Sequence, residues 1–110
     1  MANTFKLKTK AGVTSLATVY TVPSSTTAIV LGMVIGNTTS SAITSTVTLS
    51  SDTSDTETNA DVEVITNAAI PGNSSLEIMA GNKIVMQTTD YIRVYGSGAV
   101  DICLSIMEIT

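Results

Sequence analysis

The 110-residue sequence contains no histidine and no tryptophan, and it has a single cysteine, a single phenylalanine and two prolines. Without histidine, the chain lacks the commonest metal ligand and the most versatile acid–base side chain. No Gly-x-Ser-x-Gly turn presents an activated serine, and no glycine-rich loop leads into a helix that holds phosphate. We therefore expect a protein that is not an enzyme and that carries no metal or cofactor.

Charge is scarce as well, because charged residues make up 13% of the chain and the net charge is −4. Phosphate contacts require clustered lysine and arginine, so we expect no nucleic-acid partner. The longest apolar run, residues 28–36, is about half of the roughly 20 residues that a membrane-spanning helix needs. No export signal opens the chain, so we expect a protein made in a cytoplasm and without membrane contact.

Hydroxyl side chains are abundant instead, with 19 Thr and 13 Ser. Threonine favours strands because its branched Cβ packs on a pleated face, and serine–threonine runs such as residues 38–41 and 50–58 are typical of loops. The cysteine, Cys103, excludes an intrachain disulfide, and its place in an alternating pattern predicts a small buried or half-buried side chain. The composition as a whole indicates an all-β chain.

Apolar residues alternate with polar ones between turn residues along most of the sequence, which predicts short strands. We expect nine of them, at residues 5–8, 16–22, 27–37, 43–50, 60–70, 76–79, 84–87, 91–95 and 100–106. Residues 80–83 are expected to connect a hairpin. About eight or nine strands in one domain, residues 1–110, predict an antiparallel two-sheet β-sandwich that is jelly-roll-like.

The stretch TAIVLGMVIGN, residues 27–37, is apolar on both faces of a strand. Simple alternation places Ile29, Leu31, Met33 and Ile35 on one face, and Val30, Gly32, Val34 and Gly36 on the other. The first face is expected to line the core between the sheets, and the second must be covered by something else. A neighbouring subunit is one cover, since glycines allow another backbone to approach closely, and a loop of the same chain is the other.

Two groups of charged residues have alternative interpretations. Lys6, Lys8 and Lys10 would share the solvent face of a first strand, either to discourage edge pairing or to dock on an acidic partner. An acidic group lies near the middle of the chain and comprises Asp52, Asp55, Glu57, Asp61 and Glu63. Its interpretations are a solvated loop, a calcium site, although the helix–loop–helix spacing fails, or pairing with the lysines of a neighbour.

A third candidate surface is formed by Tyr91, Arg93 and Tyr95, which alternate on one face of a strand. Aromatic rings beside arginine can stack on sugars or bases. The other interpretation is an ordinary solvent-facing row in which the long arginine lies across the rings.

Several turn and core motifs characterise the chain. They are residues 19–23 (VYTVP) before the long apolar strand, Gly36-Asn37 after it, Ile70-Pro71-Gly72, the turn at residues 80–83 and the closing residues 107–110 (MEIT). In these motifs, and over nearly its whole length, the chain resembles small virion structural proteins of tailed bacteriophages, especially marine and cyanobacterial phages.

The resemblance implies a small all-β protein that is assembled in the infected cell and located in the virion. It further implies a capsid decoration or cement protein, which stabilises the shell by bridging capsomers and has the major capsid protein as its partner. A homo-oligomer is expected, and the three-fold junctions of capsids favour a trimer. The alternatives are a neck or tail accessory protein of the phage, and a module that binds glycans or the host surface.

Overall fold

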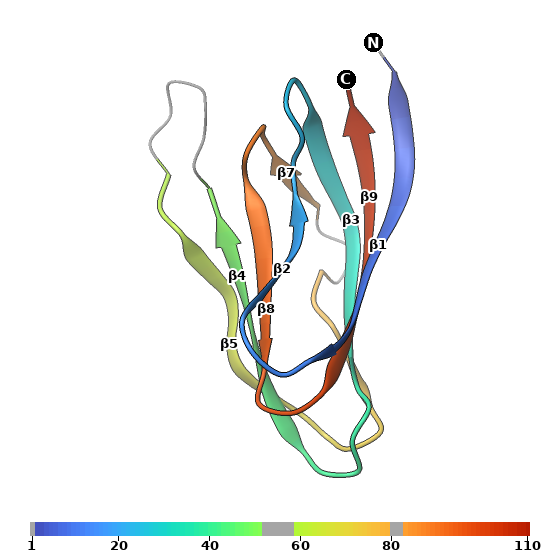
Figure 1. Cartoon of the computed structure of the whole chain (residues 1–110), viewed down its shortest axis with the longest axis vertical. Coiled ribbons are helices and arrows are strands. Elements are labelled where there is room, and N and C mark those ends of the chain that lie inside the picture. The colour runs from blue at the N-terminus through green and yellow to red at the C-terminus, as the bar shows by residue number, and fades with distance from the viewer. Residues whose placement is uncertain (1, 52–58, 80–82) are drawn as a thin grey trace.

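The computed structural model describes residues 2–51, 59–79 and 83–110, and its regular elements there are strands. In chain order they are β1 (Asn3–Val13), β2 (Ala17–Thr21), β3 (Thr27–Asn37), β4 (Ile43–Ser50), β5 (Val62–Ile70), β6 (Ser75–Glu77), β7 (Ile84–Met86), β8 (Tyr91–Gly96) and β9 (Val100–Ile109). They form two antiparallel sheets that pack face to face (Figure 1). Within the described residues, no helix long and apolar enough to cross a membrane is present.

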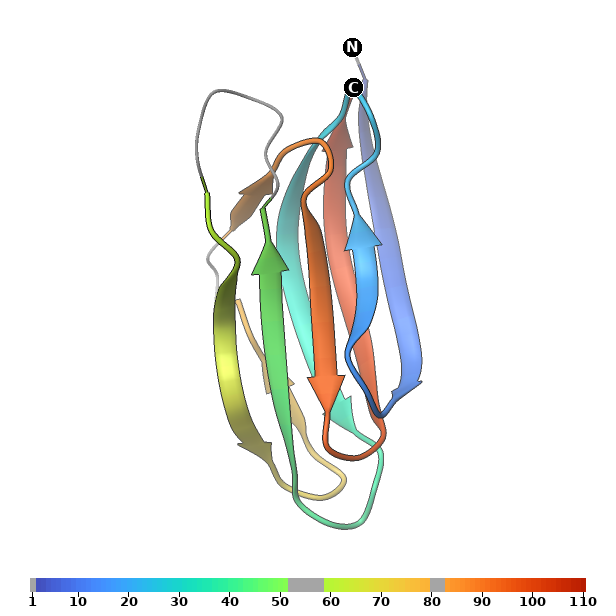
Figure 2. The ribbon, with the colours of Figure 1, turned by 60° about the vertical axis from the view of Figure 1, so that its left-hand side comes forward.

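The strands pair in a nested order. The first pairs with the last, β1 with β9, and inside that pair come β2 with β8, β3 with β6 and β7, and β4 with β5. Successive pairs alternate between the sheets, so the five-stranded sheet has the order β1-β9-β3-β6, with β7 also on β3, and the four-stranded sheet has the order β2-β8-β4-β5. Figure 2 shows the four-stranded sheet in front of the other. This winding is that of a jelly roll, so the predicted all-β two-sheet sandwich is confirmed.

The core lies between the sheets and is made by the inward side chains of the central strands. Val100, Ile102, Leu104 and Ile106 of β9 are all buried, as the alternation predicts. They face the four-stranded sheet, whose buried apolar side chains include Val47, Ile92 and Val94. Burial of these rows is the main source of stability, at about 25 cal/mol for each Å² removed from water.

Strand β3 departs from simple alternation at Leu31. Val30 lies opposite Ile106 but Gly32 lies opposite Ser105, so β3 holds one extra residue, Leu31, at a bulge. A bulge reverses the parity of every residue that follows it. Val30, before the bulge, therefore shares the core side with Met33, after it, and is fully buried, whereas Ile29 lies opposite Met107 on the outer side, so the predicted faces of Val30 and Ile29 are wrong.

Strand β1 is longer than expected, because it continues past residues 9–12 to Val13. Gly12 has a positive φ of 64°, and its N–H donates to Asp101 Oδ1 at 2.9 Å, so the chain turns there without leaving the sheet. The strand lies at the edge of its sheet, as predicted.

Strands β6 and β7 do not form the predicted hairpin. Both run antiparallel to β3, β6 against residues 34–36 and β7 against residues 28–30, so they lie end to end along one edge. The middle of the connection, residues 80–82, lies outside the described residues. In β5 simple alternation would place Val62 and Val64 on the inner side, and this is wrong, because both are exposed and Val64 falls at an irregularity of the pairing with β4.

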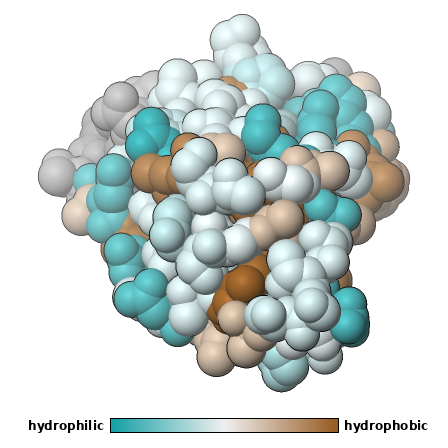
Figure 3. Space-filling model, turned by 60° about the horizontal axis from the view of Figure 1, so that its bottom comes forward, coloured by the Kyte–Doolittle hydropathy of each residue, from teal (hydrophilic) through white to brown (hydrophobic). Residues whose placement is uncertain are grey.

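The end of the sandwich formed by the β3–β4 and β5–β6 connections is organised by Asn37. Its buried side-chain Nδ2 donates to the carbonyl oxygens of Ser41, Ile70 and Pro71, at 2.8, 3.0 and 3.1 Å. Gly72 is required beside it, because an added Cβ would lie 2.4 Å from the carbonyl oxygen of Ser40. Two of the motifs in the resemblance, Gly36-Asn37 and Ile70-Pro71-Gly72, thus meet at one place. Figure 3 looks toward this end and shows mostly pale, neutral polar residues with separate brown patches.

Candidate functional site

The outer face of the five-stranded sheet carries large apolar side chains that the fold leaves in solvent. Phe5 and Leu7 of β1 are 72% and 62% exposed, and Val34 of β3 and Val85 of β7 are 39% and 65% exposed. Residues directly opposite each other in antiparallel strands point to the same side. The pairs Phe5 with Met107 and Val85 with Ile29 add two partly buried side chains to this surface, which we call the apolar face.

The apolar face includes three of the four residues of β3 that the sequence marked as a candidate interface. Gly32, Val34 and Gly36 lie opposite Ser105, Cys103 and Asp101 of β9, which are all exposed. These three residues lie on the outer face, as predicted, whereas Val30 lies in the core. Val34 is 39% exposed, so no loop among the described residues covers the face at this position.

One end of the apolar face is hollowed. A depression of about 320 Å³ is lined by Thr9, Lys10, Ala11, Val34, Gly36, Asp101, Ile102 and Cys103. The glycines of β3 contribute to the low relief, because a Cβ added at Gly32 would meet no atom within 4 Å, and one at Gly36 would meet only the carbonyl oxygen of Asp101, at 3.9 Å. Cys103 is exposed here, so the prediction of a buried or half-buried thiol is wrong. Its partner across the sheet, Thr9, shows that it points outward with the odd residues of β1.

Lys6, Lys8 and Lys10 share one side of β1, as predicted, but this is the side turned toward the other sheet, because they lie opposite the inward residues Ile106, Leu104 and Ile102. Since β1 is at the edge of its sheet, Lys6 and Lys10 are nevertheless exposed and Lys8 is half-buried. The Nζ of Lys6 lies 2.7 Å from Oε1 of Glu108, which is 5% exposed. A buried carboxylate needs such a partner, and this ion pair gives Lys6 a structural role.

A second partner of Glu108 is Tyr20 on the opposite sheet, whose hydroxyl donates to Oε2 at 2.6 Å. The hydrogen bonds from Lys6 and then from Tyr20 lower the pKa of Glu108, and burial together with the nearby carboxylate raises the pKa of Tyr20. The Nζ of Lys8 lies 5.9 Å from the centre of the Tyr20 ring. These contacts join β1 and β9 to β2 and close the sandwich on that side.

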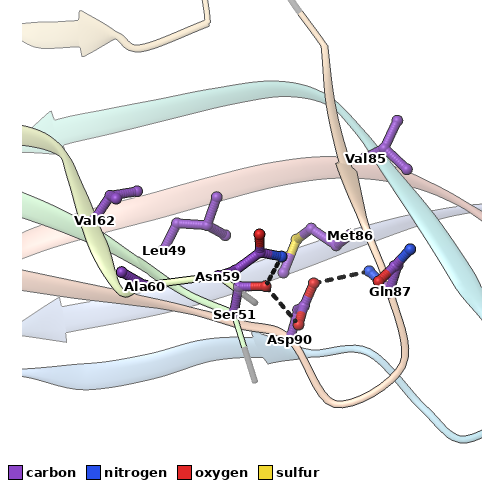
Figure 4. A pocket seen from close by; sticks show the side chains of 9 residues that line it. All are labelled: Leu49, Ser51, Asn59, Ala60, Val62, Val85, Met86, Gln87 and Asp90. Carbon is purple, nitrogen blue, oxygen red and sulfur yellow. Dashed lines mark hydrogen bonds between the residues drawn. The ribbon is translucent and has the colours of Figure 1, made fainter. Parts of the chain in front are cut away.

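A second hollow, of about 550 Å³, lies where β4, β5 and β7 come together (Figure 4). It is lined by Leu49, Ser51, Asn59, Ala60, Val62, Val85, Met86, Gln87 and Asp90. The carboxylate of Asp90 accepts from the Gln87 N–H at 3.0 Å and from the Ser51 hydroxyl at 3.2 Å, and Asn59 Nδ2 donates to Ser51 Oγ at 2.9 Å. These polar groups bind one another and hold the corner together.

The outer face of the four-stranded sheet is of a different kind. Tyr91, Arg93 and Tyr95 of β8 lie opposite Ser50, Thr48 and Thr46 of β4, so the structure brings the three predicted residues together on a hydroxyl-rich surface, which we call the hydroxyl face. Arg93 lies over the ring of Tyr91, with its Cζ 4.9 Å from the ring centre. Neither of the two hollows involves these residues.

The acidic group is described only in part. Asp52, Asp55 and Glu57 lie outside the described residues, and Asp61 and Glu63 are exposed. Within residues 2–51, 59–79 and 83–110, no three acidic, cysteine or histidine side chains are placed to hold a metal ion. The calcium interpretation is therefore untested at three of its five residues.

Comparisons with known proteins agree with the architecture. No family profile and no curated protein matches the chain. Among solved structures, it is similar to a chain of the Bacillus endospore appendages, which form a novel family of disulfide-linked pili. The match covers 96% of this chain and 85% of that chain, with 14% identity and a TM-score of 0.50. At this identity the likeness shows the fold alone.

Proposed function

We propose that this chain is a structural subunit of a tailed-phage virion, and that it is a capsid decoration protein that stabilises the shell by bridging capsomers. The observation that carries the proposal is the apolar face, where Phe5, Leu7 and Val85 are more than half exposed on one side of a single sheet. Exposed apolar patches of this kind mark surfaces that bind other proteins. The resemblance to small virion proteins supports the phage assignment.

The mechanism is thermodynamic linkage. A protein that binds only the assembled shell stabilises it by an amount that grows with the logarithm of the free protein concentration divided by the dissociation constant. When this ratio is about 100, the stabilisation is about 2.7 kcal/mol. No reacting group is required for such an activity. A rigid sandwich suits it, because binding then orders few side chains and loses little entropy.

An assembly role is compatible with this fold. The solved neighbour, which has a similar fold over 96% of this chain, belongs to pili, which are polymers. A jelly roll with one apolar and one hydroxyl-rich outer face suits repeated contacts with identical neighbours. The alternative of a neck or tail accessory protein uses the same face but in few copies.

The glycan-binding alternative depends on Tyr91, Arg93 and Tyr95. Arg93 covers one side of the Tyr91 ring, which leaves the 37% exposed Tyr95 as the freer of the two aromatic platforms. A glycan pocket requires a concave site, and the hydroxyl face contributes to neither hollow. We therefore favour the structural role.

The test is the copy number of this protein relative to the major capsid protein in purified particles, measured by quantitative mass spectrometry. We expect hundreds of copies in a simple ratio to the capsomers. A dozen copies would move the protein to the neck or tail, and its absence from particles would overturn the virion proposal.

A further inference from the structure

The apolar face has a large end and a small end. Toward the chain termini, its outward side chains are large and comprise Phe5, Ile29, Met107 and Val85. Toward the other end most outward positions are small, at Thr9, Gly36, Cys103 and Ser75, with Val34 and Glu77 as the larger exceptions, and the 320 Å³ hollow lies there. One face therefore presents both raised side chains and the space that can receive them.

We propose that two copies of this chain pack through their apolar faces, with the strands of one antiparallel to those of the other. The two-fold axis crosses the strands at the row of Lys8, Leu104 and Met33, which lie side by side in the sheet. A two-fold contact uses the same patch twice, so the large end of each copy fills the hollow of its partner. Because the proposed function uses the same face to bind capsomers, the pair is the state of the free protein, and docking on the shell replaces the partner copy.

The register of the sheet fixes which residues meet. Rotation about that row places Phe5 of one copy over Ala11 of the other on β1, and Ile29 over Gly36 on β3. On β9 it places Met107 over Asp101, at the rim of the same hollow. Stacked sheets lie about 10 Å apart, and large side chains opposite small ones are what fill such a gap.

The area of the face is sufficient for a stable pair. Strands of 11 residues at about 3.3 Å per residue are about 36 Å long, and four strand positions about 4.8 Å apart are about 19 Å wide. Each copy therefore contributes on the order of 700 Å², roughly a tenth of its 5833 Å² surface. Two copies bury about 1,400 Å², within the usual range for specific interfaces.

The edge of the sheet is a poorer route to a dimer. If two β1 strands paired across a two-fold axis, even-numbered residues would lie opposite even-numbered residues, because directly opposite residues point to the same side of a sheet. Every central register of that kind places Lys6 or Lys8 opposite Lys6 or Lys8 of the other copy. Like charges directly opposite are destabilising, so β1 opposes edge pairing while Phe5 and Leu7 leave its outer side apolar.

Charge also favours the antiparallel arrangement over a parallel one. The acidic residues that the pairing places on the outer side are Asp101 and Glu77, opposite Gly36 and Val34, both toward the hollow end. Parallel stacking would bring the four carboxylates of two copies together, whereas antiparallel stacking separates them. Because the chain carries a net charge of −4, we expect the pair to strengthen as salt is raised.

The first experiment is sedimentation equilibrium of the purified chain over a range of concentrations. We expect a monomer–dimer equilibrium with a mass approaching twice 11.4 kDa and a dissociation constant on the order of micromolar. A monomer at the highest soluble concentration, or a trimer, would overturn the two-fold pairing.

Matched variants then test the surface. Leu7→Glu buries an unpaired charge in the proposed interface, and we expect it to weaken the dimer by a factor on the order of 100 or more. Leu16→Glu is the control, because Leu16 is 51% exposed and precedes β2, outside the apolar face. Gly36→Arg is a second disrupting variant, since a Cβ there meets no atom closer than 3.9 Å and the fold accepts it. Equal dimerisation by Leu7→Glu and Leu16→Glu would refute the surface.

The thiol of Cys103 reports on which face is buried. It is exposed in the single chain, so alkylation should slow as concentration rises and dimers form, and Leu7→Glu should restore the fast rate. A dimer in which Cys103 reacts as fast as in the monomer uses another surface and would contradict the proposal.

Discussion

The two outer faces of the sandwich are built by the same alternation but end in different chemistry. On the five-stranded sheet the outward positions include Phe5, Leu7 and Val85, whereas on the four-stranded sheet they include Thr46 and Thr48. The inner faces of both sheets supply the apolar core, with the Lys6–Glu108 pair as a polar contact at one side. The difference is therefore independent of folding, since hydroxyl side chains would serve on either outer face.

The comparison shows which side chains the fold requires and which it leaves free. An exposed leucine or phenylalanine lowers solubility and adds little to the core, so its presence on one face and near absence from the other points to contact with another protein. The threonine surface keeps the opposite side wet while its β-branched stems favour the strand.

The largest expected effect is the difference in stability between a leucine-to-alanine change in the core and the same change on the apolar face. Leu104→Ala leaves a cavity in the core, because Leu104 is fully buried, and should lower the free energy of unfolding by about 2–5 kcal/mol. Leu7→Ala on the apolar face should change it by about 0.5 kcal/mol or less. Urea unfolding at a concentration at which the chain is monomeric measures both. Similar losses in the two variants would mean that the apolar face belongs to the core.

An intermediate effect is expected at the buried contact between the sheets. Glu108→Gln removes the charge that binds Lys6, and the loss at neutral pH should be about 1–3 kcal/mol. Because the folded state lowers the pKa of Glu108, its contribution is present above the pKa of the unfolded chain and is lost as pH falls. Unfolding measured from pH 7 to pH 3 should therefore show a flatter dependence in the variant below about pH 5.

The complementary change, Tyr20→Phe, tests the alkaline side of the same contact. The folded state raises the pKa of Tyr20, so this group stabilises the fold up to its ordinary value and the contribution declines as pH rises above about 10. The variant should lack that alkaline decline. An unchanged profile in both variants would mean that other groups set the pH dependence.

The smallest effect is expected on the hydroxyl face. Thr48→Val keeps the shape of the strand and removes a half-buried hydroxyl that makes no hydrogen bond within the described residues, so the free energy of unfolding should change by less than about 0.5 kcal/mol. Light scattering should instead show new association through this face. A variant that stays as soluble as the parent would weaken the contrast between the two faces.

Much of the fold could be predicted from the sequence. The strands at residues 27–37 and 43–50 have the expected bounds, and the inward row of β9 was recognised because its alternation is uninterrupted from Val100 to Ile106. The turn at Pro23 and the hydroxyl side of β4 followed from local chemistry of the same kind. Such features depend on neighbours in sequence, which a single sequence displays.

The errors arose where a residue far away in the sequence determines which way a side chain points. In β3 every residue from Ala28 to Ile35 is apolar or glycine, so nothing local marks Leu31 as the extra residue, and only pairing with β9 does so. In β1 the lysines share one side as expected, but nothing local shows that this side is turned toward the other sheet, where Lys6 pairs with Glu108, about a hundred residues away, while its side chain stays 43% exposed. Contacts of this range have no signature in a single sequence.

The nested pairing also fixes the order in which the molecule can be completed during synthesis. Strand β9 lies between β1 and β3, yet it is the last of the nine strands to leave the ribosome. Until β9 arrives, β1 has no partner strand in its sheet, and β3 lacks its neighbour on the edge that faces β1. Sheets rich in such long-range pairings close slowly. The nascent chain therefore cannot close this part of its core until β9 has been synthesised.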